Sequence, residues 1–369
     1  MEIQWASPSF GEEEERELLD AFRSGWVSQG PKVKAFEEAI ARFLGVKHAV
    51  AVNSGTSALD VALKALGIGP GDEVIVPDFT YIATANAVVY QGARPVTVDV
   101  DPRTLNLDPE RVREAITPRT RAVIPIDYGG CFADYAGLES LAAEHGLWLL
   151  QDAAHSIGGS YRGRRPGEFG VGGTLSFHTA KVMTSVEGGM FVTNRDDLAN
   201  AARVLRNQGE PAGKKYSFPV IGNNYRMSDL HAAIGLAQAK KLPWLLRRRS
   251  EIVGWYKAAL RGSPGITLPQ VPEGTVHPWF LFSILFASGK ARDAAEGALK
   301  AAGIETRICF PIPVHRQEAY RDMQPPNPCP VSQWAAERTL SLPLHAALTR
   351  QQVERVCDVL LASPHVLAR

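Results

Sequence analysis

Lys181 is the residue of this chain whose surroundings most directly suggest chemistry. It ends the run Ser176-Phe177-His178-Thr179-Ala180-Lys181, which is mostly small and apolar, and Glu187-Gly188-Gly189 follows. A surface position is the default for a lone lysine, because its charge normally stays in water. Partial burial near another cationic group would lower its pKa and leave a neutral amine able to form an imine. The segment therefore indicates a nucleophilic lysine.

Asp152 ends the apolar run Leu147-Trp148-Leu149-Leu150-Gln151, which is typical of a buried strand. A carboxylate at the end of such a strand needs a partner, since an isolated buried charge is very costly. A protonated pyridine nitrogen would be such a partner, and the pair would hold the ring as an electron sink. Alternatively, Asp152 caps a helix that begins at Ala153. His155 could donate to a phenolic oxygen of a bound ring, or it could be a half-buried capping residue.

The segment Asn53-Ser54-Gly55-Thr56-Ser57 connects a predicted strand to a predicted helix. Glycine allows the backbone close to an anion, Thr56 and Ser57 offer hydroxyl groups, and the helix N-terminus offers free N–H groups. An ordinary helix cap explains the same residues equally well. The segment is neither GxGxxG nor a Walker sequence, so a simple nucleotide-binding protein is not the first hypothesis.

These three segments must be positioned by an alternation of strands and helices. Strands are predicted over 48–52, 73–76, 95–98, 122–126, 147–150, 172–177, 190–193 and 280–286. Helices are predicted over 11–24, 33–44, 57–66, 83–90, 109–115, 138–144, 228–260 with an interruption near Pro243, 291–302 and 351–361. Continuous apolar strands separated by amphipathic helices predict an α/β fold with a mostly parallel sheet covered on both faces. We expect a large domain over 1–245 and a smaller α+β domain over 246–369. Ligands of such sheets bind beyond the carboxyl ends of the strands.

The composition excludes several classes of function. The chain has 369 residues and a net charge of +1, and the densest basic cluster, 247–249, suits a solvated helix face better than a nucleic-acid site. Four scattered cysteines without a CxxC pair, and nine histidines without ligand spacing, predict no metal site and no disulfide framework. The acidic N-terminus is unlike a signal peptide, and no apolar stretch is long enough to cross a bilayer. We expect a cytoplasmic protein that binds neither membranes nor nucleic acids.

With these residues in view, nearly the whole chain resembles the DegT/DnrJ/EryC1/StrS family of pyridoxal-phosphate (PLP) dependent sugar aminotransferases, which have the aspartate-aminotransferase fold, fold type I. The resemblance rests on many motifs in the right order. They are 25–31 (GWVSQGP), 53–59 (NSGTSAL), 80–87 (TYIATANA), 152–155 (DAAH), 176–178 with Lys181, 187–189 (EGG), 224–229 (NYRMSD) with Ala232-Ala233, and 311–317 (PIPVHRQ).

The resemblance implies a role for each residue of the cofactor site. Lys181 would carry PLP as a Schiff base and act as the general acid and base, and Asp152 would hold the pyridine nitrogen. The remaining cofactor contacts would be His155 at the ring hydroxyl, Tyr81 stacked on the ring, Gly55, Thr56 and Ser176 at the phosphate, and Asn224 and Arg226 reaching the phosphate from a partner subunit. This last pair implies an obligate homodimer with composite active sites, although an exposed loop over 224–229 is the alternative.

The resemblance also implies the substrates: an amino donor, most often L-glutamate, and a nucleotide-linked keto-sugar used in surface-polysaccharide or deoxyamino-sugar biosynthesis. The positions that contact the substrate in this family correspond in this sequence to Trp26, Asp127, Tyr128, His178 and His315. Two segments depart from the family pattern, because Asp127 stands where many relatives have histidine and Cys309-Phe310 where several have His-Tyr. These departures leave the sugar, the nucleotide and the aminated carbon open.

Other functions remain to be distinguished. One branch of the family accepts cyclitol ketones. Another replaces the lysine by histidine and removes a hydroxyl group, which Lys181 argues against. A PLP-binding regulatory protein without turnover is a further alternative, but no DNA-binding element at either end favours it.

Overall fold

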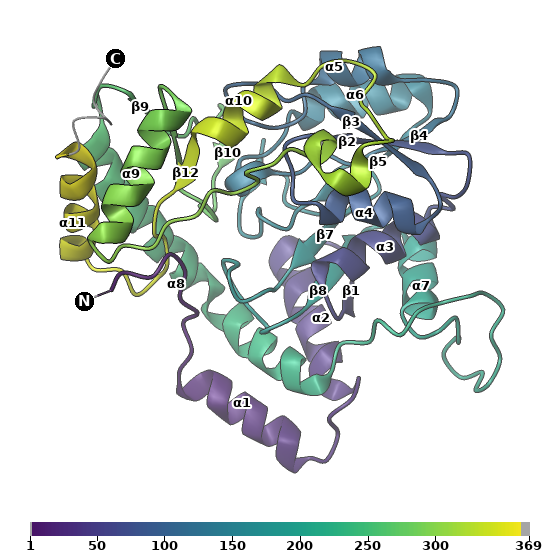
Figure 1. The fold of residues 1–369 in the computed structure, drawn as a ribbon. Coiled ribbons are helices and arrows are strands. Elements are labelled where there is room, and N and C mark those ends of the chain that lie inside the picture. The colour runs from purple at the N-terminus through teal and green to yellow at the C-terminus, as the bar shows by residue number, and fades with distance from the viewer. Residues whose placement is uncertain (1, 363–369) are drawn as a thin grey trace.

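The computed structural model describes residues 2–362 and is built around one seven-stranded sheet, whose arrangement can be followed in Figure 1. The strand order is β1-β8-β7-β5-β4-β2-β3. The strands are β1 (His48–Val52), β2 (Glu73–Pro77), β3 (Arg94–Val98), β4 (Thr120–Val123), β5 (Trp148–Asp152), β7 (Gly172–Ser176) and β8 (Gly189–Thr193). Neighbours from β3 to β7 run parallel, whereas β8 is antiparallel to both β7 and β1. The predicted mostly parallel α/β sheet is confirmed.

Alternate residues of these strands point to opposite faces, and different helices cover each face. Val74 and Val76 of β2 pack with α3 (Gly55–Ala65), α4 (Ala83–Tyr90) and α7 (Asp196–Leu205), whereas Ile75 packs with α5 (Pro109–Ala115) and α6 (Tyr135–His145). On this second face, β1, β7 and β8 pack against α2 (Pro31–Leu44). The strands are therefore buried on both sides, and polar ligands can approach only at the strand ends.

A second core lies at the other end of the molecule, shown on the left in Figure 1. A three-stranded sheet in the order β12-β11-β9 packs with α9 (Gly289–Ala301), α11 (Arg350–Leu361) and the last turns of α8 (Asp229–Leu260). Its strands are β9 (Ile266–Thr267), β11 (Ser283–Phe286) and β12 (Thr339–Ser341), and Ile3 from the start of the chain joins the same core. The remaining elements are α1 (Glu12–Arg23), α10 (Pro330–Arg338), the ribbon β6 (Ser160–Tyr161) with β10 (Thr275–Val276), and the 3₁₀ turns η1 (Tyr128–Gly130), η2 (Val314–Arg316) and η3 (Glu318–Tyr320).

The predicted interruption near Pro243 is wrong, because α8 continues through this proline. Proline inside a helix costs about 3 kcal/mol through a lost hydrogen bond and a ring clash. Leu242 and Leu245 on either side of it are buried in the main core. Burying each such side chain contributes about 1.5–3 kcal/mol, which offsets the cost.

The prediction that 247–249 forms a solvated face is wrong for Arg249. Arg247 is exposed, but Arg249 is buried and donates to the carbonyl oxygens of Trp279 and Phe280 at 3.0 and 3.3 Å. Burial lowers the pKa of this guanidinium to about 10. Arg249 thereby fastens α8 to the segment that leads into β11. Among residues 2–362, no helix has the length and apolar character needed to cross a membrane.

Candidate functional site

A cavity of about 480 Å³ opens at the carboxyl end of the sheet. The loops after β1, β2, β5 and β7 line it, together with residues 280–281 and 309–310. It brings together eight of the predicted site residues: Gly55, Thr56, Tyr81, Asp152, His155, Ser176, His178 and Lys181. Segments more than a hundred positions apart in the sequence meet here because the parallel strands end at the same edge.

The start of α3 forms one wall of the cavity. Ser54 is its N-cap and accepts a hydrogen bond from the Ser57 N–H at 3.1 Å, while Gly55 and Thr56 line the cavity. Ser54 thus acts as an ordinary helix cap, and the segment can still bind an anion, because the first N–H groups of the helix are left for another acceptor. A Cβ atom at Gly55 would lie 2.9 Å from the Ser176 Cβ, closer than van der Waals contact allows. Glycine is therefore needed for β7 and α3 to approach here.

Asp152 ends β5 with a side chain that is only 4% exposed. Its Oδ2 accepts from the Thr84 hydroxyl at 2.9 Å, and its Oδ1 accepts from the Ala154 N–H at 3.2 Å. Burial raises the pKa of this carboxyl, whereas the two donors and the Lys181 amine act in the opposite direction. The carboxylate is therefore fixed in place and suited to pair with a cation inside the cavity. Thr84 was not among the predicted site residues, although a threonine within the 80–87 motif was a signal for it.

Lys181 is half-buried, and its Nζ lies 4.5 Å from the centre of the Phe280 ring. Burial lowers the pKa of this amine to about 8, although attraction by Asp152 and then Cys309 opposes the shift. A substantial fraction of the amine is thus neutral near physiological pH. This state is the one that attacks a carbonyl group.

His155 is buried beside the same amine. Its Nδ1 accepts from the Gly129 N–H at 3.2 Å, so in the neutral ring the proton is on Nε2. Burial, reinforced by Lys181, lowers the pKa of His155 well below its ordinary value. The ring lies 4.3 Å from that of Phe280, between centroids. His155 is therefore a neutral hydrogen-bond donor through Nε2.

Aromatic residues form the rim of the cavity. Tyr81 is 61% exposed, and its ring lies 6.4 Å from that of Phe310. Phe310 has a φ of 61°, a left-handed backbone conformation that costs a residue with a side chain of this size about 1–3 kcal/mol. Contacts with Phe79 and Tyr128, at 5.4 and 5.8 Å between ring centroids, hold it there.

Two predicted substrate residues lie behind the cavity wall. Asp127 is completely buried, does not line the cavity, and accepts four hydrogen bonds. The donors are the Ala133 N–H at 3.2 Å, the Tyr135 hydroxyl at 2.8 Å, Gln151 Nε2 at 2.7 Å and the Ser156 hydroxyl at 2.5 Å. Tyr128 is buried too, and its hydroxyl donates to Ser283 Oγ at 3.3 Å. The expected substrate contact of Asp127 is wrong for this geometry, because no acceptor position remains. Tyr128 does not line the cavity either and packs against Phe79 and Phe310, of which Phe310 does line it.

Four further predicted residues lie outside the cavity of this chain. Trp26 is 59% exposed and donates from its indole to the Gln29 carbonyl, and His315 lies in a separate hollow. Arg226 donates to Asn207 Oδ1 at 2.8 Å, and Asn224 pairs with Asn207 in an isolated bridge. His315 therefore does not line this cavity. Asn224 and Arg226 do not line it either, and their expected position is in the site of a partner subunit.

Comparisons with known proteins agree with this geometry. The sequence profile of the DegT/DnrJ/EryC1/StrS aminotransferase family matches residues 8–361. The chain is 41% identical over 362 residues to the GDP-perosamine synthase of Caulobacter vibrioides, covering 97% of each. It is 40% identical over 376 residues to the spore coat polysaccharide biosynthesis protein SpsC of Bacillus subtilis, covering 96% of this chain and 95% of that protein.

A solved structure supports the same assignment. The PLP form of the putative sugar aminotransferase Spr1654 from Streptococcus pneumoniae superimposes with a TM-score of 0.94 at 28% identity, and the match covers 100% of each chain. The predicted family, fold class and reaction type are confirmed. The chain belongs to the DegT/DnrJ/EryC1/StrS aminotransferase family, whose members depend on PLP, and it is a sugar aminotransferase of fold type I.

Proposed function

We propose that this enzyme binds PLP in the cavity around Lys181 and moves an amino group from L-glutamate to the keto group of a nucleotide-linked sugar. The observation that carries the proposal is the Lys181 amine beside the buried Asp152 carboxylate in one cavity. The name of the relative GDP-perosamine synthase supports a nucleotide-linked substrate, and that of SpsC supports a role in polysaccharide biosynthesis. A cyclitol ketone is the alternative amino acceptor.

The residues present fit each part of PLP. Its aldehyde matches the Lys181 amine, and its pyridine nitrogen matches the Asp152 carboxylate held by Thr84. The ring hydroxyl suits His155 Nε2, and the phosphate suits the start of α3 with Ser176, where Gly55 leaves space that a Cβ would fill. The exposed Tyr81 ring offers a face for stacking.

The chemistry follows from the protonation states of these side chains. PLP, once bound, supplies an electron sink for the electron pair left by a broken C–H bond. The Asp152 carboxylate favours the protonated pyridine nitrogen, because the pair neutralises two charges away from water. The Lys181 Nζ, with a pKa near 8, can take a proton from the donor carbon and return it during the second half of the reaction. Phe280 and Phe310 line the cavity and place apolar surface beside this transfer.

We further propose an obligate homodimer in which Asn224 and Arg226 reach the phosphate of the partner's site. Large apolar side chains exposed on the single chain support such an interface, among them Phe22, Trp26, Tyr216 and Ile221. A mixture of Lys181→Ala and Arg226→Ala subunits should recover up to about one quarter of the wild-type activity, because half of the reassorted dimers are mixed and each holds one intact site. No recovery after proven subunit exchange would contradict the shared site.

The cellular location and the division into domains are further proposals. We propose a cytoplasmic location, since nucleotide-linked sugars and glutamate are available there. We also propose the division into domains 1–245 and 246–369. The separate apolar core around Tyr256, Phe282 and Leu340 supports it, although α8 crosses the boundary and Ile3 packs into the smaller core.

The deciding experiment combines spectroscopy with product analysis. Wild-type protein saturated with PLP should absorb in the visible range, lose this absorbance with excess L-glutamate, and then aminate members of a panel of nucleotide keto-sugars and cyclitol ketones, read by mass. Borohydride should trap PLP on the peptide that contains Lys181. Lys181→Ala should fold but lose the trapped adduct and all transamination, and turnover by this variant would overturn the proposal. Conversion by glutamate without amination of any ketone would favour the regulatory alternative.

A further inference from the structure

A second cluster of chemically active side chains lies outside the cofactor cavity. Asp78 directly follows β2, His315 belongs to η2, and Cys329 is the N-cap of α10. One ligand atom from each residue lies within 4.8 Å of those of the other two. The three segments are separated by more than 200 positions and by 14 positions in the sequence, so only the fold brings them together.

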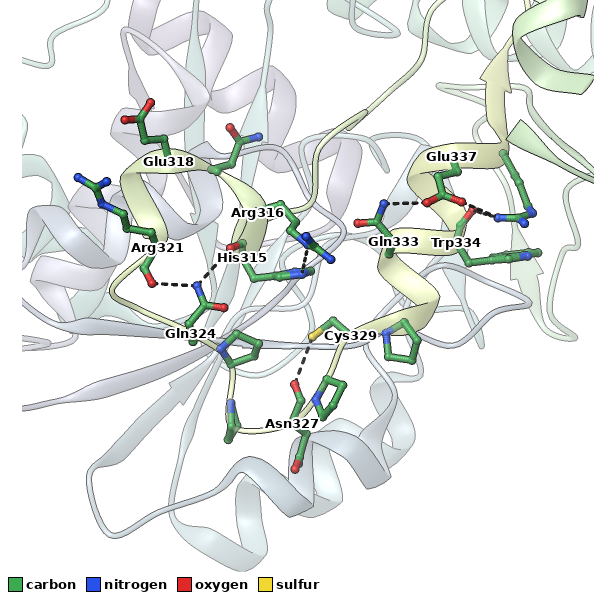
Figure 2. A pocket seen from close by; sticks show the side chains of 16 residues that line it. His315, Arg316, Glu318, Arg321, Gln324, Asn327, Cys329, Gln333, Trp334 and Glu337 are labelled. Atoms are coloured by element: carbon green, nitrogen blue, oxygen red, sulfur yellow. Dashed lines mark hydrogen bonds and ion pairs between the residues drawn. The ribbon is translucent and has the colours of Figure 1, made fainter. Parts of the chain in front are cut away.

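The cluster forms part of the wall of an open hollow of about 860 Å³ (Figure 2). His315 and Cys329 both line this hollow, while Asp78 is completely buried behind His315. Cys329 is only 5% exposed, and its sulfur lies 3.7 Å from the Asn327 carbonyl oxygen. The ligand atoms are thus held at a protein–solvent boundary, which an ion can reach and where a water molecule can complete its coordination.

The charges of the cluster leave room for a cation. Asp78 accepts from the His315 N–H at 2.8 Å, and its Oδ2 lies 2.6 Å from His315 Nδ1. Among residues 2–362, His315 is the only side chain in an ion pair with Asp78. Arg316 Nε donates to the other ring nitrogen, His315 Nε2, at 3.1 Å, so Nδ1 is the nitrogen that faces Asp78 (Figure 2). Burial raises the pKa of the Asp78 carboxyl and of the Cys329 thiol, and for the thiol the nearby carboxylates of Asp78 and Asp99 add to the effect. A dication would stabilise both anions in this place.

We propose that Asp78, His315 and Cys329 bind a divalent transition-metal ion, Zn²⁺ or an ion of similar preference. One carboxylate oxygen, one imidazole nitrogen and one thiolate sulfur are a ligand set that Zn²⁺ accepts, with water as the fourth ligand. The ion would replace the thiol proton, and the Nδ1 proton of His315 would move to Nε2, so that Arg316 Nε would no longer donate to this nitrogen. Metal–ligand distances of about 2.0–2.3 Å place tetrahedral ligand atoms roughly 3.3–3.6 Å apart, so the Asp78–His315 pair must open by about 1 Å or less.

Such an ion would join three parts of the fold. It would tie the start of α10 and the turn at His315 to the end of β2. Tyr81 follows Asp78 by three residues, and Phe310 precedes His315 by five, and both line the cofactor cavity. The metal would therefore stabilise the rim of the cavity without contacting the substrates.

The proposal is tested on PLP-saturated enzyme that has first been stripped with a chelator. Titration with Co²⁺ as the probe should give a sulfur-to-cobalt charge-transfer band that saturates at one ion per chain, and Zn²⁺ should displace it and raise the melting temperature. Loss of an outer partner of a metal ligand weakens binding about 10–100-fold, so Cys329→Ala should weaken it by more than about 100-fold and abolish the band. His315→Gln should weaken binding while the sulfur ligand remains.

Cys357→Ala is the matched control, because Cys357 is equally buried but lies in the smaller core, away from Asp78 and His315. It should bind Co²⁺ like the wild type, and since every variant retains PLP, binding to the cofactor phosphate is the same in all of them. Absence of the band in wild-type enzyme, or an equal affinity in Cys329→Ala, would overturn the proposal and show that Asp78 and His315 form a structural ion pair only. Neither outcome affects the assignment of Lys181.

Discussion

The hydroxyl of Thr84 donates to Oδ2 of Asp152 at 2.9 Å, and both side chains are buried at the back of the cofactor cavity. Thr84 also shares a hydrogen bond with the Thr80 hydroxyl at 3.0 Å. A helix that follows β2 therefore holds the carboxylate that ends β5. The orientation of the proposed partner of the cofactor nitrogen depends on two strands rather than one.

Replacing Thr84 by valine should weaken cofactor binding while leaving the fold intact. Valine keeps the shape but removes the donor, and a hydrogen bond to a charged group contributes about 1.5–3 kcal/mol. We expect the PLP dissociation constant, measured by absorbance titration, to rise about 10–100-fold. Thr84→Ser, which keeps the hydroxyl, should bind PLP nearly as well as the wild type. Equal affinity in Thr84→Val would show that Ala154 alone holds Asp152.

Gly55→Ala should damage the proposed phosphate site. The new Cβ would lie 2.9 Å from the Ser176 Cβ, so α3 and β7 must move apart. We expect a lower PLP affinity and a lower melting temperature. Part of the melting temperature should return in Gly55→Ala/Ser176→Gly, in which the opposing Cβ is absent, whereas the PLP affinity should stay low because the Ser176 hydroxyl is lost as well. Gly254→Ala is the control: within residues 2–362 no atom outside the neighbouring backbone lies within 4 Å of the added atom, and alanine in a helix stabilises by up to about 1 kcal/mol relative to glycine. A Gly55→Ala protein with unchanged PLP affinity would argue against this site.

The rate at which Lys181 captures the cofactor should depend on pH. Because burial lowers the pKa of this amine to about 8, the neutral form rises steeply as the pH increases through 8, well below the ordinary lysine value of 10.5. Initial rates of adduct formation between cofactor-free protein and pyridoxal, followed by absorbance, should show an inflection near pH 8. Lys181→Ala gives the background from other amines. An inflection near 10.5 would mean that the amine is solvated.

The lowered pKa of Lys181 also makes the free energy of unfolding depend on pH. The unfolded chain holds the Lys181 proton up to about pH 10.5, whereas the folded chain releases it near 8. Between these values the unfolded state binds more protons, so this residue makes the free energy of unfolding increase with pH across that window.

Asp127→Asn should lower stability without changing the apparent affinity for the keto-sugar. All four groups around this carboxylate donate, so the asparagine NH₂ would face another donor, at a cost of about 1–3 kcal/mol. Burial raises the pKa of Asp127 to about 7, so the folded state binds the extra proton between pH 3.8 and 7. Wild-type stability therefore loses this contribution as the pH rises through the window, and the variant lacks that slope. Urea unfolding below and above pH 7 measures both effects.

Steady-state kinetics provide the complementary measurement for Asp127→Asn. With saturating PLP, the KM for the keto-sugar should match the wild-type value. A raised KM in a protein of unchanged stability would restore Asp127 to the substrate site.

Several features of this protein follow from the sequence alone. The apolar strands between amphipathic helices predicted the sheet, because a strand buried on both faces needs apolar residues at consecutive positions. The motifs around Gly55, Asp152 and Lys181 predicted the residues that meet in one cavity, since short segments at the carboxyl ends of parallel strands must share an edge. Local order along the chain was sufficient for both inferences.

Only the tertiary structure decided which side chains face that cavity and which support it from behind. Asp127 and Asp152 both end apolar strand segments, yet four donors enclose Asp127 while Asp152 faces the cavity. Pro243 and Arg249 likewise depend on packing partners distant in sequence. Local ligand spacing in the sequence could not predict that Asp78 and His315 lie beside Cys329. These residues belong to three separate segments that only the fold brings together. Burial and hydrogen-bond partners arise from contacts between distant segments, and no local pattern encodes them.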